Sequence, residues 1–296
     1  MVGSALVRRL AGERGEILTA TRAELDLTDQ AAVRAWFDRH RPQAVLLAAA
    51  RVGGILANDR QPADFLLDNL LIQTNVIEAA HRTDVEKLLF LGSSCIYPRL
   101  ADQPITEDAL LSGPLEPTNQ WYAMAKLAGV KLCQAYRRQH ERDFISVLPT
   151  NLYGPGDNFD LQTSHVLPAL VRKAHEAKES GAVALEIWGT GTPRREFLHV
   201  DDLADACLFL MARYSGDAPV NIGVGQDIAI LDLARLVAEV VGFTGEIRCD
   251  PSKPDGTPRK LLSVAVLGDL GWRPRIGLRD GIERLYADYR QGAVRP

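Results

Sequence analysis

The chain has 296 residues, 46% hydrophobic and 24% charged, which is enough to bury one large core or two modest ones. Its formal net charge of −4 argues against nucleic acid or an anionic membrane surface as the main partner. No apolar run approaches the roughly 20 residues of a membrane span, and the four cysteines are scattered without a CxxC pair. We therefore expect a protein of the reducing cytosol, with neither a disulfide framework nor a metal site.

Predicted strands and helices alternate along the first half of the chain. Apolar residues at helical spacing predict a helix up to Leu10, and a strand is expected over residues 16–21. Thr28 or Asp29 can cap a helix that runs to about His40. We then expect strands over 43–50, 85–92 and 144–149, the first buried on both faces, and helices over 62–82 and 121–142. This alternation predicts an α/β fold with a Rossmann-like, doubly wound parallel sheet.

The second half of the chain predicts a smaller α/β unit beside this sheet. Asp201 or Asp202 is expected to cap a helix that ends near Arg213. His199 is expected to be structural, although with the two aspartates it could also suggest a metal. Strands are further expected over 220–223 and near 246–248, with helices over 167–178, 230–241 and 278–289.

A glycine-rich turn that cradles a dinucleotide normally lies between the first strand and the first helix of such a sheet. Gly3 matches the last glycine of this turn, but the strand and the earlier glycines do not precede it. An ordinary glycine at a helix start is the alternative. We favour a chain that lacks the first strand, and expect impaired folding, weaker cofactor binding and unpaired backbone groups on the neighbouring strands.

The choice of cofactor can be predicted about 20 residues after the glycine turn, where an acidic residue binds the ribose of NAD and an arginine suits the 2′-phosphate of NADP. Counted from Gly3, this window contains Arg22. We predict NADP with Arg22 as the phosphate clamp, the alternative being a solvated loop residue. Asp26 could lie near the adenine or cap the next helix.

Two stretches carry the chemistry. Residues 91–98 offer the hydroxyl of Ser93 and the thiol of Cys95, while Tyr122 and Lys126 are four apart and share one helix face. An ammonium beside a phenol stabilises the phenolate and lowers its pKa toward the working range. Such a phenol can pass a proton to a carbonyl oxygen while hydride reaches the carbon. Alone, the Tyr–Lys spacing is a weak signal that an ordinary exposed helix can also carry.

Ligand-binding candidates follow the predicted sheet. A lone histidine such as His165 is more often a core or surface residue than a catalyst. Trp188 and the pair Arg194–Arg195 are suited to stacking on a base and pairing with phosphate, the alternative being a solvated basic turn. The loop over 253–260 gathers cations where a polyanionic ligand could be held.

Ser93, Tyr122 and Lys126, in this order, resemble the extended short-chain dehydrogenase/reductases that act on nucleotide sugars. The resemblance runs along essentially the whole chain and is closest to the branch that acts on GDP-sugars. Its most specific stretches are Gly92-Ser-Ser-Cys-Ile-Tyr-Pro98 and Ser252-Lys-Pro-Asp-Gly-Thr-Pro-Arg-Lys260. Further matching stretches are 48–55, 116–119, 149–155 and 164–165.

This resemblance implies NADPH-dependent 3,5-epimerisation and 4-reduction of GDP-4-keto-6-deoxy-mannose to GDP-L-fucose. Tyr122 would be the acid at the ketone oxygen, with Lys126 lowering its pKa and Ser93 hydrogen-bonding the oxygen. Cys95 fits as the base, because nearby cations lower a thiol pKa. His165 fits as the acid on the opposite face.

The resemblance also implies the surroundings of both ligands. Around NADP it places Gly3, Arg22, Asp26, Ala48, Ala50, Leu91, Gly92, Tyr122, Lys126, Pro149, Asn151, Leu152 and His165, with Asn151 and Leu152 near the nicotinamide. Around the GDP-sugar it places Arg172 or Lys173, together with Trp188, Arg195 and Lys260. Residues 1–158 and 196–226 would form an NADP-binding domain without its first strand, and 159–195 and 227–296 a substrate-binding domain.

A homodimer is implied as well, through a four-helix bundle built from the helices around 62–82 and 122–141, although the same apolar faces could be buried within one monomer. Two other functions compete with the implied one. One is an epimerase or reductase acting on another nucleotide sugar, but a plain 4-epimerase or 4,6-dehydratase needs neither Cys95 nor His165. The other is a non-catalytic NADP-binding module, which has no need of the proton donor Tyr122.

Overall fold

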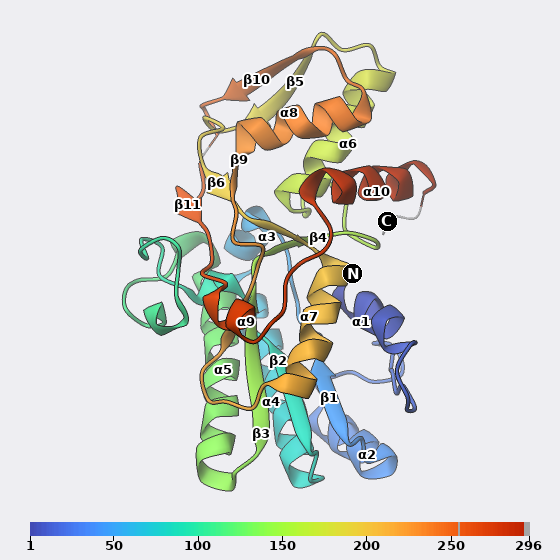
Figure 1. Ribbon diagram of the computed structural model, residues 1–296, viewed down its shortest axis with the longest axis vertical. Helices are drawn as coiled ribbons and strands as arrows, with labels where there is room; N and C mark the ends of the chain where they lie inside the picture. The colour runs from blue at the N-terminus through green and yellow to red at the C-terminus, as the bar shows by residue number, and fades with distance from the viewer. Residues whose placement is uncertain (254, 293–296) are drawn as a thin grey trace.

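Over the described residues, 1–253 and 255–292, the computed structural model has a four-stranded parallel sheet at its centre (Figure 1). The strands lie in the order β1 (Ala44–Leu47), β2 (Lys87–Leu91), β3 (Asp143–Pro149) and β8 (Val220–Ile222). Leu46 pairs with Leu89, which pairs in turn with Ile145. β2 and β3 are buried along almost their whole length because helices cover both faces of the sheet. The predicted α/β fold is confirmed.

Two predictions about the outer edge of this sheet are wrong. Residues 16–21 form no strand and are mostly exposed. No described strand lies beside them to pair with, and a strand without a partner would leave its backbone N–H and C=O groups unsatisfied. β1 is not buried on both faces: Ala44 is exposed, and only Leu47 is fully buried. Among the described strands β1 has one hydrogen-bonded neighbour, β2, so this edge of the sheet is open.

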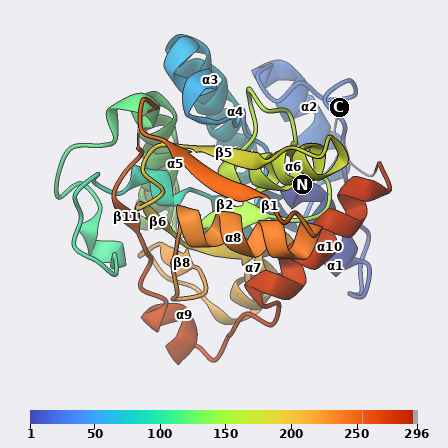
Figure 2. The same cartoon turned by 90° about the horizontal axis from the view of Figure 1, so that it is seen from above.

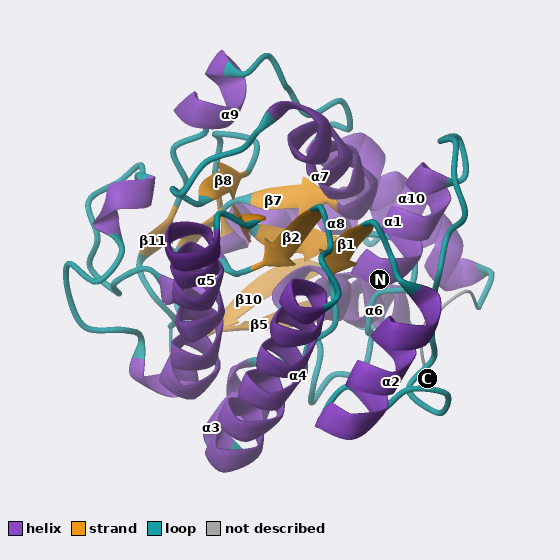
Figure 3. Cartoon of the chain, turned by 90° about the horizontal axis from the view of Figure 1, so that it is seen from below, coloured by secondary structure: helices purple, strands orange, loops and turns teal. Residues whose placement is uncertain are grey.

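Helices lie on both sides of the sheet, as Figure 3 shows from below. One face carries α2 (Gln30–His40), α4 (Pro62–Arg82) and α5 (Gln120–His140), and the other α1 (Val2–Leu10) and α7 (Val200–Arg213). The predicted bounds of α4 are confirmed to the residue. Of the two predicted caps of α2, Asp29 is the N-cap: its carboxylate accepts a hydrogen bond from the backbone N–H of Ala32 at 3.1 Å. No described helix is both long and apolar enough to cross a membrane.

The cap predicted for α7 is wrong. The imidazole of His199, not an aspartate, caps the helix, since its Nδ1 accepts the backbone N–H of Asp201 at 3.2 Å. The carboxylate of Asp202 is directed elsewhere, to the backbone N–H groups of Arg275 and Ile276 at 3.0 and 2.8 Å. His199 is 1% exposed, in accordance with its expected structural role.

A second group of elements forms the upper part of the molecule in Figure 1. β5 (Ala184–Trp188) pairs in parallel with β10 (Glu246–Asp250). Seen from above in Figure 2, these strands lie close to α6 (Val166–Glu179) and α8 (Ile230–Val241), and α10 (Leu278–Arg290) completes the shared apolar core. The bounds predicted for α8 are confirmed, and the helix ends where Gly242 adopts a φ of 78°.

Short strands join the two groups. β4 (Asn151–Tyr153) pairs with β7 (Phe197–His199), and β6 (Arg194–Arg195) lies between β9 (Ile228–Ala229) and β11 (Arg259–Lys260). The other described elements are α3 (Ile55–Arg60), α9 (Ala265–Asp269) and the 3₁₀ helices η1 (Ser94–Ile96), η2 (Glu107–Ala109) and η3 (Pro117–Asn119). The residues of β4, β6, β7 and β11 therefore lie at the junction between the sheet and the upper elements (Figure 1).

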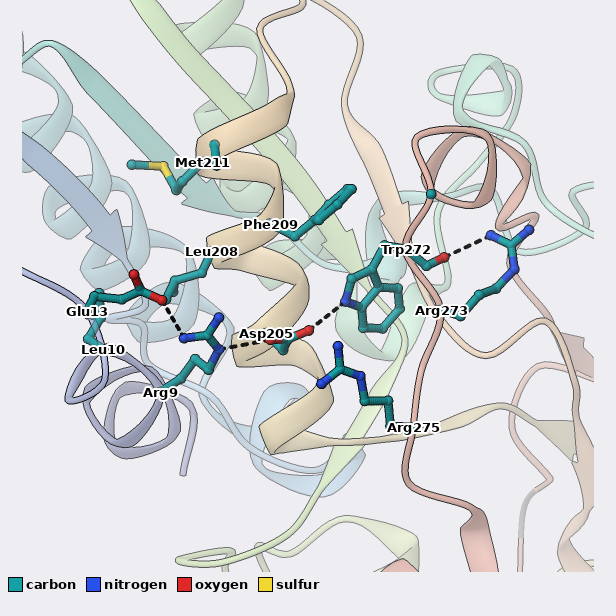
Figure 4. Close-up of a pocket in the computed structure, with 12 residues that line it drawn as sticks. Arg9, Leu10, Glu13, Asp205, Leu208, Phe209, Met211, Trp272, Arg273 and Arg275 are labelled. Atoms are coloured by element: carbon teal, nitrogen blue, oxygen red, sulfur yellow. Dashed lines mark hydrogen bonds and ion pairs between the residues drawn. The ribbon is translucent and has the colours of Figure 1, made fainter.

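A cavity of about 590 Å³ lies between α1, α7 and the segment 271–275 (Figure 4). The carboxylate of Asp205 holds its walls together, accepting from Arg9 Nε at 2.8 Å and from Trp272 Nε1 at 2.9 Å. Arg9 also pairs with Glu13 at 2.7 Å. None of the predicted catalytic residues lines this cavity, so it is separate from the predicted site.

Candidate active site

The carboxyl end of β2 places the first two catalytic candidates. Gly92 has no room for a side chain, since a Cβ there would lie 2.6 Å from Leu148 Cδ2. The backbone then turns into η1, and the Ser93 hydroxyl accepts a hydrogen bond from the backbone N–H of Cys95 at 3.2 Å. Ser93 and Cys95 are thus fixed side by side at the edge of the sheet where ligands bind in such folds.

The first two turns of α5 add the phenol and the amine. The Tyr122 hydroxyl is hydrogen-bonded to Ser93. Lys126 is 3% exposed, and its Nζ donates to the carbonyl oxygen of Leu91 at 2.8 Å. α5 can approach the sheet this closely because Gly129 has no side chain: a Cβ there would lie 2.4 Å from the ring of Phe90. The structure therefore brings Ser93, Cys95, Tyr122 and Lys126 together, as the sequence predicted.

The predicted effect of Lys126 on the pKa of Tyr122 stays a prediction, because burial dominates the pKa of this phenol. Burial raises the pKa of the Tyr122 phenol above its usual value, and the neighbouring Cys95 sulfur raises it further, against the opposing hydrogen bond with Ser93. Burial also lowers the pKa of Lys126 to about 7. The hydrogen bond of the Lys126 amine goes to a backbone carbonyl, and the net direction of the Tyr122 pKa is set by burial.

Lys126 makes the stability of the cofactor-free protein depend on pH. Because its folded-state pKa is about 7 and its ordinary value is 10.5, the unfolded chain binds more protons between these values. Stability therefore rises with pH across that window, and at pH 7 and below the burial of this amine costs on the order of 4 kcal/mol. We expect Lys126→Met to stabilise the protein at pH 6.5 much more than at pH 9.5, as measured by urea unfolding.

Lys131→Met is the matched control for this prediction, because Lys131 lies on the same helix but is exposed. Its difference in unfolding free energy from the parent should be small and equal at both pH values. A Lys126→Met difference that does not vary with pH would contradict the lowered pKa of Lys126.

Two cations from the short strands β6 and β11 at the junction face Cys95. Lys260 Nζ lies 3.8 Å from Cys95 Sγ, and the guanidinium of Arg195 is near enough to interact electrostatically with the sulfur. Arg195 and Lys260 are register partners in the parallel pair of β6 and β11, which explains why both cations approach one point. Burial lowers the pKa of Arg195, so this cation sits in a partly dehydrated environment.

His165 lies at the start of α6, on a loop that is tied to the end of β1. The carboxylate of Asp160 accepts from the backbone N–H groups of Gln162 and Thr163, both at 3.0 Å. The backbone N–H of Gly54 donates to Thr163 O at 3.1 Å. His165 is an exposed residue. Enough protein nevertheless surrounds its imidazole ring for desolvation to lower the pKa of the ring. The loop therefore brings His165 to the same sheet edge, without direct contact to the other four catalytic candidates.

Trp188 is the centre of a second cluster at the end of β5. Its side chain is exposed at 53%, and the Nζ atoms of Lys173 and Lys253 lie 5.6 and 5.8 Å from its ring centroid. Of the two alternatives left by the sequence, Lys173 faces Trp188, whereas Arg172 pairs with Glu176 at 2.7 Å. Lys253 was not singled out from the sequence, although it belongs to the cation-rich loop.

The remaining residues predicted around the cofactor lie mostly at the carboxyl ends of the strands, and the others lie in α1 or between α1 and α2. Ala48 and Ala50 follow β1, while Leu91, Gly92, Pro149, Asn151 and Leu152 lie at the carboxyl ends of β2 and β3 or just beyond. Arg22 is exposed, and Gly3 lies in the first turn of α1 with open space around its Cα. Asp26 accepts the backbone N–H and hydroxyl of Thr28 at 2.9 and 2.8 Å, so it closes the turn before α2.

A parallel sheet with serine, tyrosine and lysine at its carboxyl edge is typical of the short-chain dehydrogenase/reductases. Within that class, the chain belongs to the NAD dependent epimerase/dehydratase family, whose model matches residues 1–224. It is 58% identical to the GDP-L-fucose synthase of Sinorhizobium fredii (strain NBRC 101917 / NGR234), covering 98% of this chain and 92% of that one. It is 60% identical to GDP-L-fucose synthase 1 of Arabidopsis thaliana, covering 98% and 90%. Among solved structures it resembles a GDP-L-fucose synthetase from Naegleria fowleri bound to NADP, with 30% identity and a TM-score of 0.91 over 98% of this chain and 90% of that one.

Proposed function

We propose that the protein catalyses the GDP-L-fucose synthase reaction: it epimerises GDP-4-keto-6-deoxy-mannose at C3 and C5 and reduces it at C4 with NADPH. The observation that carries this proposal is Cys95, held beside Ser93 and 3.8 Å from the ammonium of Lys260. A reductase needs only the serine, tyrosine and lysine. A base with cations behind it is what proton removal next to the ketone requires in addition.

The fit of NADP rests on Lys126. This buried amine has a backbone carbonyl, and no carboxylate, as its hydrogen-bond partner among the described residues, so donor capacity remains for a polar ligand. NADPH, when bound, supplies the hydride for C4. We propose that the residues at the sheet edge hold the nicotinamide and ribose, that Arg22 binds the 2′-phosphate, and that Gly3 and Asp26 lie near the rest of the dinucleotide; the edge residues are Ala48, Ala50, Leu91, Gly92, Tyr122, Lys126, Pro149, Asn151, Leu152 and His165.

One ketone serves both halves of the proposed reaction. Ser93 and Tyr122 hydrogen-bond its oxygen, so that negative charge can collect there when Cys95 takes a proton from the adjacent carbon. His165 returns a proton to that carbon from the opposite face, which inverts it; its lowered pKa makes the imidazolium a stronger acid. After both inversions, hydride adds to C4 and Tyr122 protonates the oxygen.

The GDP-sugar is proposed to extend from Cys95 into the upper elements. Arg195 and Lys260 lie beside the sulfur, and Trp188 with Lys173 offers a ring and a cation for the nucleotide. This division matches two proposed domains. Residues 1–158 and 196–226 would bind NADP, and residues 159–195 and 227–296 would bind the substrate.

The same proposal includes a homodimer formed by α4 and α5. Both helices carry exposed apolar side chains, with Leu67 at 57% and Met124 at 51%. We expect Leu67→Glu combined with Met124→Glu to give a monomer in size-exclusion chromatography with light scattering. Val183→Glu is the control, because Val183 is 78% exposed in the upper part of the molecule. A parent protein that is monomeric at micromolar concentration would contradict the homodimer.

We further propose a cytoplasmic location. All four cysteines are free thiols, and Cys95 must stay reduced to serve as a base. A reducing compartment preserves such thiols.

The direct test is NADPH oxidation by the purified protein with GDP-4-keto-6-deoxy-mannose, with GDP-mannose as the control substrate. We expect consumption of NADPH with the keto sugar alone and a product that co-elutes with GDP-L-fucose. Consumption that yields an uninverted sugar would leave a reductase and remove the epimerase. No consumption at all would refute the proposed function.

A further inference from the structure

Glu196 is a fully buried carboxylate that bonds to backbone groups instead of a cation. It is 0% exposed. Its Oε1 accepts the N–H groups of Val224 and Gly225 at 2.6 and 2.7 Å, and its Oε2 accepts the N–H of Leu262 at 3.0 Å. Burying an ionisable group at this depth is costly, so its position calls for an explanation.

The carboxylate is admitted by a glycine. A Cβ at Gly223 would lie 2.3 Å from Glu196 Oε1, so this close approach is possible only without a side chain. Burial raises the pKa of Glu196, against three backbone hydrogen bonds and one with the Thr150 side chain. The buried carboxylate of Glu196 therefore needs these N–H donors for its stabilisation. The hydrogen bonds in turn hold the backbone of Val224, Gly225 and Leu262 in place.

Glu196 connects the cation pair to the rest of the site. It directly follows Arg195 in the chain, and its Oε2 holds Leu262, two residues after Lys260. Its own carbonyl oxygen accepts Asn151 Nδ2 at 2.8 Å, on the proposed nicotinamide side.

The segment 259–263, which we call the strap, is fixed from two directions. Gln103 Oε1 accepts the N–H of Leu261 at 2.8 Å, and the backbone of Ile105 pairs with Leu261 and Ser263 at 2.8 Å. Glu196 supplies the contact at Leu262. Lys260 lies at the start of this fixed stretch, with its Nζ 3.8 Å from Cys95 Sγ.

We propose that Glu196 is a positioning residue: by bonding the strap and the turn after β8, it holds Arg195 and Lys260 against Cys95 and so sets the reactivity of that thiol. The inference rests on the proposed function in one respect, since it assigns the effect to the epimerisation half of the reaction. The geometric part concerns only how cations are held near a sulfur. It can therefore be tested without substrate.

The substitution Glu196→Gln changes the hydrogen-bonding groups of the side chain but keeps its volume nearly constant. A carboxylate offers acceptors on both oxygens, whereas an amide turns one of them into an NH₂ donor. In the variant this donor must face either Leu262 N–H or the N–H groups of Val224 and Gly225, which are donors themselves. One of the two attachments is then lost at nearly constant side-chain size.

The readout is alkylation of Cys95 by iodoacetamide, followed at the level of its peptide so that Cys249 is counted separately. Cations near a sulfur favour the thiolate that reacts with this reagent. We expect Glu196→Gln to slow Cys95 alkylation about tenfold at neutral pH, and Lys260→Met to slow it comparably. The combined variant should be slowed by less than the product of the two single effects, because both changes act in part through Lys260.

Asp227→Asn is the matched control. Asp227 binds Arg194 and Arg259, which alternate with Arg195 and Lys260 along the same two strands. A general loosening of these strands would slow alkylation in this variant too, whereas the proposed role of Glu196 leaves it unchanged. An equal effect of Asp227→Asn and Glu196→Gln would overturn the inference.

Gly223→Ala provides a second route, because its new methyl group displaces the carboxylate without removing it. It should slow Cys95 alkylation in the same direction as Glu196→Gln. Parent-like alkylation in either variant, with a thermal unfolding transition that shows a folded protein, would refute the positioning role. Slowed alkylation in a protein that makes no GDP-L-fucose would leave the role of Glu196 standing and remove the proposed function.

Discussion

Tyr122→Phe is expected to reduce NADPH consumption with the keto sugar by about 10³-fold or more while proton exchange beside the ketone continues. The raised pKa of Tyr122 keeps its phenol protonated at neutral pH, which suits an acid that must protonate an alkoxide. Phenylalanine has no proton to give. Ser93 can still hydrogen-bond the oxygen, and Cys95 is untouched, so the carbanion can still form.

Two measurements check this prediction on the same sample. Absorbance of NADPH reports reduction, and mass spectrometry of the recovered substrate in heavy water reports deuterium at C3 and C5. Tyr136→Phe is the control, because Tyr136 lies on the same helix near its end, packed against His81 and His140. Undiminished NADPH consumption in Tyr122→Phe would remove Tyr122 as the acid.

The elements that the sequence predicted to the residue are those whose limits are local. α4 begins at Pro62, a residue that favours the first turn of a helix, and α8 ends where Gly242 takes the left-handed conformation. The failed strand over 16–21 has adequate β-forming residues, but strand formation needs a partner from elsewhere in the chain. The sequence of residues 16–21 alone does not show whether another strand is available to pair with them.

In the candidate site, too, the features set by nearby residues were predicted, and those set by distant residues were not. The spacing of Tyr122 and Lys126 is local, and the structure places Tyr122 beside Ser93 and Lys126 against the carbonyl of Leu91. The direction of the Tyr122 pKa shift could not be predicted, because it depends on burial and on the sulfur of Cys95. Glu196 was missed for a stronger reason: its partner Leu262 is 66 positions away, and a carboxylate that follows two arginines gives no local sign of being buried.

Cys95→Ser is expected to slow formation of the fucose product by 10²-fold or more, within the range that a general base contributes. A serine hydroxyl at this position is a far weaker base than a thiolate flanked by Lys260 and Arg195. Ser93, Tyr122 and Lys126 are unchanged, so reduction remains possible. The variant should therefore release a GDP-6-deoxy sugar that keeps the original configuration at C3 and C5.

Three readings taken together isolate the role of Cys95. Deuterium uptake at C3 and C5 should disappear, NADPH affinity should match that of the parent, and the product should separate from GDP-L-fucose. Cys249→Ser is the control, since this second partly accessible thiol lies on β10, in the upper part of the molecule. Formation of GDP-L-fucose by Cys95→Ser at the parent rate would show that another group removes the protons, and Lys260 and Arg195 would then serve only to bind the substrate.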